Sequence, residues 1–183
     1  MAQPTQFDRG TKTLVLGGAR SGKSEYAESL LTGFADVRYV ATGYSASGDA
    51  AWAERVTRHR RRRPTTWSTL ESLDLPTILA EPGSPVLIDC LSLWLTRTMD
   101  ATDAWNASAA GPAVENRISE VVTAWTAAVC TVVAVTSEVG LGVIPETLAG
   151  AAFRDALGVL NRTLAAVSDE VWLVVAGIPL RVK

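Results

Sequence analysis

The sequence is poor in the residues from which many protein metal sites are built. It contains a single histidine, His59, and two cysteines, Cys90 and Cys130, and the histidine is far from both cysteines in the chain. No zinc-type ligand spacing is therefore present. Both cysteines lie in apolar runs, so we expect buried free thiols, which suit a reducing cytosol.

Long apolar runs are also absent. No stretch reaches the roughly 20 apolar residues that a membrane-spanning helix needs. The first ten residues, MAQPTQFDRG, lack the apolar centre of a signal peptide. We therefore expect a cytoplasmic protein without a membrane span.

The sequence has no excess of positive charge, since 17 Lys and Arg residues face 19 Asp and Glu residues and the net charge is −2. A general nucleic-acid-binding surface would favour a positive balance, so we expect no nucleic-acid partner. Hydrophobic residues make up 48% of the 183 residues, which is enough for a full-sized core. We expect one catalytic domain over residues 1–183, with residues 1–11 as a loose arm.

Short apolar runs alternate with segments of helical spacing along the chain. Strands are predicted at residues 13–16, 38–41, 65–69, 85–89, 131–135, 171–176 and 180–182. Helices are predicted at residues 25–31, 50–61, 75–80, 91–99, 114–129 and 149–167. Residues 100–112 are predicted to form a loop, and residues 177–179 a turn. Apolar strands separated by helices predict an α/β fold, with a mostly parallel sheet covered by helices on both faces.

One complete phosphate-binding loop follows the first predicted strand. Its sequence, GGARSGKS, matches G-x-x-x-x-G-K-[ST] at every fixed position and stands between a strand and a helix. Backbone N–H groups and the helix N-terminus hold phosphate oxygens in such a loop, while the serine hydroxyl can reach Mg²⁺. The motif predicts a P-loop NTPase-like fold that binds a nucleoside triphosphate through Gly17, Gly18, Ala19, Arg20, Ser21, Gly22, Lys23 and Ser24.

Polar residues also follow other predicted strands, and ligands of parallel sheets bind at the carboxyl ends of the strands. Thr42 and Gly43 follow one strand, Asp89 ends another, and Glu138 follows a third. We expect Asp89 on the strand beside that of the phosphate-binding loop, where it would hold Mg²⁺ together with Ser24. The alternative is an aspartate at the N-terminus of the next helix. The role of Glu138 stays open between a site residue and a solvated loop carboxylate.

The single histidine lies in the basic run RHRRRRP at residues 58–64. One interpretation is a solvated, positive helix end. A second is a nucleic-acid-binding patch, although the run lacks interleaved aromatic residues. A third is an anion site, in which like charges disfavour the protonated imidazole and His59 keeps a lone pair for attack on phosphorus. The guanidinium groups would then neutralise charge on the phosphate oxygens. The residues alone leave all three open.

Six sequence blocks together resemble one enzyme family. They are GGARSGKS, YVATG, RVTRHRRRRPTTWSTLE, VLIDCLSLWLT, TSEVGLGVIPE and FRDALGVLN. Their order over residues 13–183 is similar to that of the bifunctional adenosylcobinamide kinase/adenosylcobinamide-phosphate guanylyltransferase of cobalamin synthesis. Two features depart from the usual pattern: Arg61 and Arg62 make the basic run more positive, and TSE replaces TNE at residues 136–138.

The resemblance implies two reactions. ATP or GTP would phosphorylate the aminopropanol hydroxyl of adenosylcobinamide, and GTP would then transfer GMP to that phosphate, giving adenosylcobinamide-GDP and pyrophosphate. It implies a covalent GMP–histidine intermediate at His59 and a homotrimer, and we expect Lys23 to compensate charge on the leaving pyrophosphate. The family's nucleotide contacts fall on the phosphate-binding loop and on Ala41, Thr42, Gly43, Arg60, Arg61, Arg62, Arg63, Glu71 and Asp89.

Two other functional classes remain as alternatives. One is a P-loop small-molecule kinase without a covalent step, and the other is a nucleic-acid-stimulated ATPase that uses the basic run as an arm. The N-K-x-D motif that reads guanine in many GTPases is absent, so base recognition must lie elsewhere. The sequence identifies neither the base of the kinase step, nor the preferred phosphoryl donor, nor the residues that contact the corrin.

Overall fold

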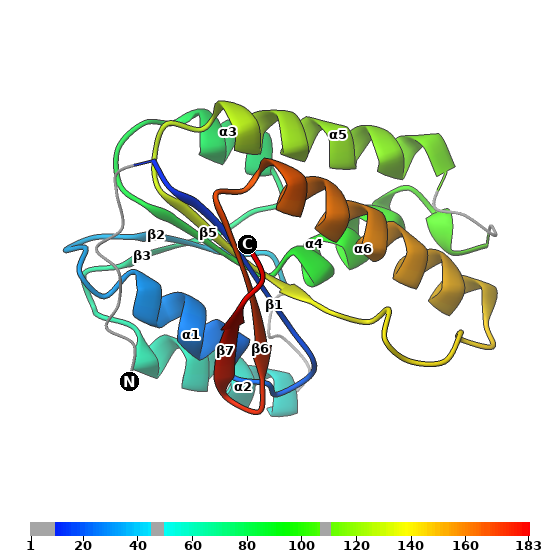
Figure 1. Cartoon of the computed structure of the whole chain (residues 1–183), viewed down its shortest axis with the longest axis horizontal. Coiled ribbons are helices and arrows are strands. Elements are labelled where there is room, and N and C mark those ends of the chain that lie inside the picture. The colour runs from blue at the N-terminus through cyan, green and yellow to red at the C-terminus, as the bar shows by residue number, and fades with distance from the viewer. Residues whose placement is uncertain (1–9, 45–49, 107–110) are drawn as a thin grey trace.

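The described residues of the computed structural model, 10–44, 50–106 and 111–183, form a seven-stranded sheet in the order β3-β2-β4-β5-β1-β6-β7 (Figure 1). All neighbouring strands are parallel except β6 and β7, which form an antiparallel hairpin. The strands are β1 Lys12–Gly17, β2 Arg38–Ala41, β3 Ser68–Glu71, β4 Val86–Asp89, β5 Val132–Ser137, β6 Glu170–Val175 and β7 Ile178–Arg181.

Helices cover both faces of the sheet, with α3, α4, α5 and α6 on one face and α1 and α2 on the other (Figure 1). Neighbouring residues of β1 therefore enter different cores: Leu14 packs with the first group of helices and Val15 with α1. The predicted α/β fold with a mostly parallel, two-sided sheet is confirmed. The helices are α1 Lys23–Leu30, α2 Ala50–Arg62, α3 Leu75–Ala80, α4 Leu91–Ala101, the short 3₁₀ helix η1 Ala104–Asn106, α5 Gly111–Ala127 and α6 Leu148–Val167.

The loop predicted at residues 100–112 is partly wrong. The end of α4, the helix η1 and the start of α5 lie within it, while residues 107–110 lie outside the described part of the chain. Ala104 is buried, and the Trp105 ring stacks on Phe153 of α6 with the ring centroids 6.3 Å apart. The Trp105 indole N–H also donates to the Asp100 carboxylate at 2.7 Å. The apolar contacts with α6 thus order a segment whose composition predicted a loop.

Two strand boundaries differ from the prediction because pairing with a neighbour sets them. Strand β3 begins at Ser68, which aligns with Arg38 of β2, whereas residues 65–67 belong to the turn after α2. The C-terminal hairpin turns at Ala176 and Gly177, both with positive φ, so β7 already begins at Ile178. Pro179 is tolerated there because β7 is an edge strand. A proline has no backbone N–H, and on the open side of an edge strand no neighbouring strand needs one.

The beginning of the predicted loose arm is outside the described residues, since these start at Gly10. The last part of that arm is anchored: the Gly10 N–H donates to the Thr131 hydroxyl at 3.2 Å, and the Thr11 carbonyl accepts from the Val132 N–H at 2.9 Å. These two residues thus continue the β1–β5 pairing and are not part of a loose arm.

The position predicted for the Asp89 strand is wrong. Strand β4, which ends at Asp89, does not lie beside β1, because β5 lies between them. Both β4 and β5 are buried on both faces and have similar apolar sequences. Their hydrophobicity therefore does not indicate which of the two strands lies next to β1. The strand that lies between β4 and β1, next to the phosphate-binding loop, is β5, and Glu138 follows it directly.

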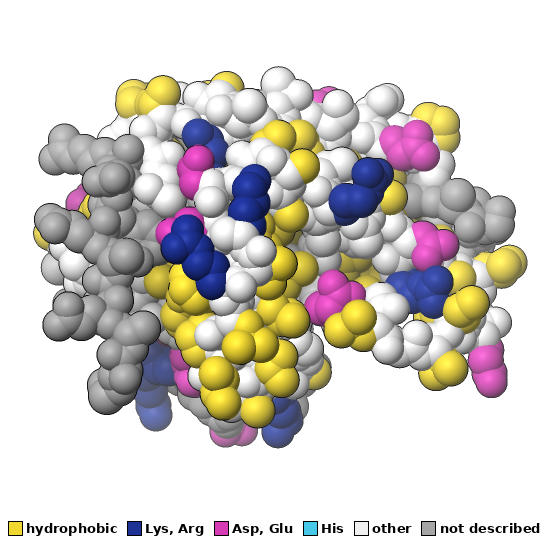
Figure 2. Space-filling model, in the orientation of Figure 1, with side chains coloured by type: hydrophobic (Ala, Val, Ile, Leu, Met, Phe, Trp, Pro, Cys, Tyr) yellow, Lys and Arg dark blue, Asp and Glu magenta, His cyan; other side chains and the backbone are white. Residues whose placement is uncertain are grey.

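One face of the molecule exposes an apolar patch over β6 and β7 (Figure 2). Its exposed side chains are Val175, Ile178, Leu180 and Val182. An uncovered edge strand with apolar side chains is a surface on which another chain can pack. Among the described parts of the chain, no helix combines the length and the apolar character that a membrane span requires.

Candidate active site

The phosphate-binding loop joins β1 to α1 and depends on its glycines. A Cβ atom at Gly17 would meet the Ser21 side chain and would approach the Val174 carbonyl to 2.8 Å, so the loop can pass this close only without a side chain. Gly22, the residue before α1, has φ 91°, which glycine adopts without strain. The Lys23 ammonium donates to the Gly18 carbonyl at 3.0 Å. This closed loop presents the N-terminus of α1 to an anion.

The strand registers bring the carboxyl ends of five strands to one edge of the sheet. Ala41 at the end of β2 aligns with both Glu71 of β3 and Asp89 of β4. On the other side, Gly17 of β1 aligns with Ser137 of β5. The carboxyl ends of these strands therefore meet beside the phosphate-binding loop, where parallel sheets bind their ligands.

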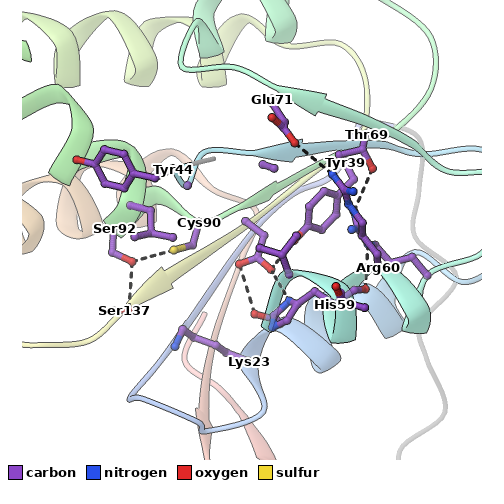
Figure 3. Close-up of a pocket in the computed structure, with 18 of the residues that line it drawn as sticks. Lys23, Tyr39, Tyr44, His59, Arg60, Thr69, Glu71, Cys90, Ser92 and Ser137 are labelled. Carbon is purple, nitrogen blue, oxygen red and sulfur yellow. Dashed lines mark hydrogen bonds and ion pairs between the residues drawn. The ribbon is translucent and has the colours of Figure 1, made fainter. Parts of the chain in front are cut away.

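A pocket of about 640 Å³ opens at this edge (Figure 3). Figure 3 shows His59, Arg60, Thr69 and Glu71 on one side, with Tyr44, Cys90, Ser92 and Ser137 on the other and Lys23 below them. The remaining residues that line the pocket are Ala19, Ser24, Tyr39, Ala41, Gly43, Ala53, Val56, Thr57, Arg63, Asp89, Leu93, Glu138 and Val139.

Asp89 is the best-connected side chain in the pocket. Its Oδ2 accepts a hydrogen bond from the Tyr39 hydroxyl at 2.8 Å and lies 3.5 Å from His59 Nδ1, while its Oδ1 accepts from the Ser24 hydroxyl at 3.4 Å. Burial would raise the pKa of Asp89, but the hydrogen bonds from His59, Tyr39 and Ser24 outweigh it and the pKa lies below its ordinary value. The helix-cap alternative is wrong, because the N-cap residue of α4 is Cys90 and the Asp89 carboxylate accepts from Tyr39 and Ser24 instead.

His59 lies in the last turn of α2 and points its Nδ1 at two neighbours, Asp89 and Arg62. A guanidinium can only donate and a carboxylate can only accept, so the two partners demand different tautomers. Arg62 already donates to both carboxylate oxygens of Glu28, at 3.1 and 3.3 Å. We therefore assign the Nδ1 proton to the contact with Asp89, which leaves Nε2 with its lone pair.

The arginines after His59 have separate functions in the structure. Arg60 and Arg63 line the pocket: Arg60 pairs with Glu71 at 3.2 Å, and the Arg63 guanidinium lies 3.5 Å from the centroid of the Tyr39 ring. Burial lowers the pKa of Arg63. Arg62 faces α1 instead, and Arg61 is exposed to solvent. The positions of Arg60 and Arg63 at the pocket thus favour the interpretation of the basic run as an anion site. The exposed Arg61 fits the interpretation as a solvated helix end.

Helix α2 is fixed against α1 by Arg62. Its guanidinium pairs with Glu25 at 2.5 Å and with Glu28 at 3.1 Å. Burial raises the pKa of Glu28, and the hydrogen bond from Arg62 partly offsets that rise. This bidentate pairing holds the last turn of α2, and with it His59, over the phosphate-binding loop.

The residues predicted to bind nucleotide fall into two groups. Those that line the pocket are Ala19, Lys23, Ser24, Ala41, Gly43, Arg60, Arg63, Glu71 and Asp89. Those that do not are Gly17, Gly18, Arg20, Ser21, Gly22, Thr42, Arg61 and Arg62. Thr42 lies beneath the pocket, where its hydroxyl donates to the Cys90 carbonyl at 2.7 Å and accepts from the Cys90 N–H at 3.0 Å. The glycines and Ser21 shape the loop backbone.

Sequence reasoning missed Tyr39 and Ser92, and it assigned no role to Ser137, which lies in the polar segment after the β5 apolar run. Tyr39 lies within the strand sequence RYVA, where it reads as an ordinary buried aromatic residue. Its hydroxyl reveals a function only through the contact with Asp89 across the β2–β4 pair. The position of Ser92 in the first turn of the helix that follows Asp89 was a weak indication that it lies near the site.

The chemistry of Ser24 and Asp89 fits Mg²⁺. Both offer oxygen atoms at the mouth of the phosphate-binding loop, and Mg²⁺ binds through few protein oxygens while keeping waters and phosphate oxygens as further ligands. No cluster of three or more His, Cys, Asp or Glu side chains suited to a metal occurs among the described residues. Such a cluster is not needed for a Mg²⁺ ion carried by a nucleotide.

Comparisons with known proteins identify the family of the chain. The family model for cobinamide kinase / cobinamide phosphate guanyltransferase (CobU) matches residues 13–182. The chain is 38% identical over 180 residues to the bifunctional adenosylcobalamin biosynthesis protein CobU of Salmonella typhimurium, covering 93% of this chain and 98% of that protein. It is 36% identical over 178 residues to the protein CobP of Pseudomonas aeruginosa, which has the same descriptive name, covering 94% and 97%.

Among solved structures, the chain is similar to the P4 protein from bacteriophage phi6 in complex with ADP, with 19% identity and a TM-score of 0.43, over 93% of this chain and 52% of that one. The family assignment rests on the sequence matches, which span nearly the whole chain. The chain belongs to the family of bifunctional cobinamide kinases and cobinamide phosphate guanylyltransferases.

Proposed function

We propose that both reactions of the family take place in the pocket at the carboxyl edge of the sheet, and that GMP transfer proceeds through a covalent bond to His59. The observation that carries this proposal is the position of His59 in the same pocket as Lys23, with its Nδ1 beside Asp89. The substrates of the proposed enzyme are GTP or ATP, together with adenosylcobinamide or its phosphate. We expect the enzyme in the cytoplasm.

The contact with Asp89 prepares His59 for attack on the α-phosphorus of GTP. With the Nδ1 proton directed at the carboxylate, Nε2 carries the lone pair that forms the new N–P bond. The bond between the α-phosphorus and the bridging oxygen of the pyrophosphate breaks at the same time. The ring then becomes cationic, and the buried carboxylate of Asp89 stabilises that charge. An oxygen of the cobinamide phosphate subsequently displaces His59 and takes the GMP.

Cationic groups around the pocket compensate the charge of the triphosphate. Lys23 and the N-terminus of α1 face the outer phosphates, while Arg60 and Arg63 lie on the side of His59. Ser24 and Asp89 would hold Mg²⁺, which supplies neutralising charge to the phosphate oxygens. The same groups serve the kinase step, in which the γ-phosphoryl group passes directly to an alcohol.

Incubation with α-labelled GTP and unlabelled acceptor distinguishes this function from a simple P-loop kinase. The covalent route predicts label on the protein before any acceptor is added, and loss of that label when cobinamide phosphate is supplied. A simple kinase predicts no protein-bound label at any time. A gain of hydrolysis with DNA or RNA that salt abolishes would instead support the ATPase alternative.

Asp89→Asn should weaken the dependence of both reactions on Mg²⁺, with activity falling about 10- to 100-fold. The change keeps the volume of the side chain but removes the charge that faces Ser24 and His59. A kinetic titration with Mg²⁺ measures the effect, and the exposed Asp155→Asn on α6 is the matched control. An unchanged Mg²⁺ dependence would remove Asp89 from the metal site.

We also propose that the chain forms a homotrimer, as the resemblance implies. The apolar patch on β6 and β7 supports this proposal, because it offers a surface that assembly would cover. Sedimentation equilibrium should therefore give a mass three times that of one chain. A monomer at micromolar concentration would contradict the proposal without affecting the assignment of the active site.

A further inference from the structure

The pocket has two chemically different sides (Figure 3). The side formed by α2 and β3 carries the ionic groups His59, Arg60 and Glu71, which suit a nucleotide. The side formed by α4 and the end of β5 carries neutral polar groups instead: Ser92 Oγ lies 3.0 Å from Cys90 Sγ and 3.1 Å from Ser137 Oγ. A chain of hydroxyl groups suits a neutral polar ligand better than a triphosphate.

Glu138 provides the charged group on this neutral side. Its backbone N–H donates to the Gly17 carbonyl at 3.1 Å, which fixes it directly beside the phosphate-binding loop. Its Oε1 accepts from the Gly140 N–H at 2.6 Å, so one carboxylate oxygen is held by its own loop. Across the described residues the structure shows no ion pair for Glu138, whereas the pocket carboxylates Glu71 and Asp89 pair with Arg60 and His59.

A nucleotide would not favour a carboxylate at this place. Phosphate oxygens are repelled by an unpaired carboxylate, and none of the lining residues at the start of α4 and the end of β5 carries a positive charge. An alcohol, in contrast, can donate its proton to a carboxylate and accept from a serine hydroxyl. The chemistry of this side is therefore that of an alcohol-binding site.

We propose that Ser92, Ser137 and Glu138 form the acceptor subsite, and that Glu138 is the base of the kinase step. This inference rests on the proposed function, since it takes the aminopropanol hydroxyl of the cobinamide as the acceptor. The hydroxyl oxygen forms a bond to the γ-phosphorus, and the bond from that phosphorus to the β-phosphate bridging oxygen breaks. The hydroxyl proton passes to the carboxylate of Glu138, and the nucleoside diphosphate leaves.

The same subsite explains how one pocket can serve two reactions in sequence. Phosphorylation converts the neutral acceptor into an anion, which the carboxylate of Glu138 then repels. The cationic groups of the pocket, Lys23 on α1 and Arg60 on α2, attract the new phosphate. The product of the kinase step thus moves away from its base and towards His59, where GMP is transferred.

The volume of the pocket, about 640 Å³, is within the usual range for one small-molecule site. In this proposal the nucleotide and the arm of the acceptor occupy it, and the acceptor subsite binds the hydroxyl end of that arm while the corrin ring stays outside. For this reason we expect the subsite residues to affect turnover of the acceptor while binding of the nucleotide stays unchanged.

Glu138→Gln should lower the kcat of cobinamide phosphorylation by about 100-fold or more, the usual contribution of a general base. The KM for ATP should stay within about twofold, because the residue does not contact the nucleotide in this proposal. Formation of the GMP adduct from GTP alone needs no acceptor and should keep its wild-type rate, which also reports that the variant is folded. Glu146→Gln is the matched control, because Glu146 is exposed in the following loop and does not line the pocket.

Ser92→Ala and Ser137→Ala give a second readout. Each should raise the KM for cobinamide severalfold and leave the KM for ATP unchanged. Two results would overturn the inference: wild-type kinase turnover in Glu138→Gln, or a parallel loss of kinase activity and of adduct formation, which would place Glu138 at the nucleotide. If the wild-type enzyme forms no adduct, the covalent step of the proposed function fails, and the comparison of kinase rates still decides the function of Glu138.

Discussion

Replacing His59 with alanine will eliminate the GMP adduct and the guanylyltransferase reaction, while cobinamide phosphorylation will remain measurable. His59 is the single histidine of the chain, so no second imidazole can take its place. We expect guanylyl transfer to fall by roughly 10⁴-fold or more, the scale of loss when a covalent nucleophile is removed. The kinase step moves the γ-phosphoryl group without a protein nucleophile, so its rate should stay within about tenfold.

Labelling with α-labelled GTP and a separate assay of phosphorylated cobinamide measure the two effects of His59→Ala. Arg61→Ala is a suitable control, because Arg61 lies in the same helix end but is exposed and outside the pocket. The adduct of the wild-type enzyme should be labile in acid and stable in alkali, as expected of a P–N bond and not of a serine ester. Labelling of the alanine variant would show that the nucleophile is another residue.

Lys23→Ala should abolish both activities, with each rate falling by at least about 10²- to 10³-fold. The Lys23 ammonium lines the pocket where the proposed function places the outer phosphates, and the chain has a single phosphate-binding loop motif, so we expect both reactions to depend on it. Parallel kinase and guanylyltransferase assays measure the loss. Lys12→Ala, at the opposite end of β1, is the control. If one activity survived in Lys23→Ala, a second nucleotide site would have to exist.

The parts of the fold that local patterns determine could be predicted from the sequence. The phosphate-binding loop, the β2 strand and helix α3 lie where glycine positions, apolar runs and helical spacing predict them. The order of strands could not be predicted in the same way. Apolar runs such as those of β4 and β5 are buried on both faces, so their composition does not say which one lies beside β1.

Some of the residues that line the candidate site could be predicted from the sequence, but their contacts could not. The sequence surrounds His59 with arginines and gives no sign that the ring faces Asp89, which is 30 residues later in the chain. That contact depends on the docking of α2 against α1 through Arg62 and Glu28. Arg60, Arg62 and Arg63 lie in one run of similar residues, yet each contacts a different neighbour in the folded chain. Those contacts could not be predicted from the run itself.

Passage of GMP through His59 can be measured on the wild-type protein by its mass after incubation with GTP and Mg²⁺ without acceptor. We expect one added guanylyl group per chain, located by peptide mapping on the segment that contains His59, and its loss when cobinamide phosphate is added. An unchanged protein mass during active turnover, or a guanylyl group on a peptide without His59, would contradict it.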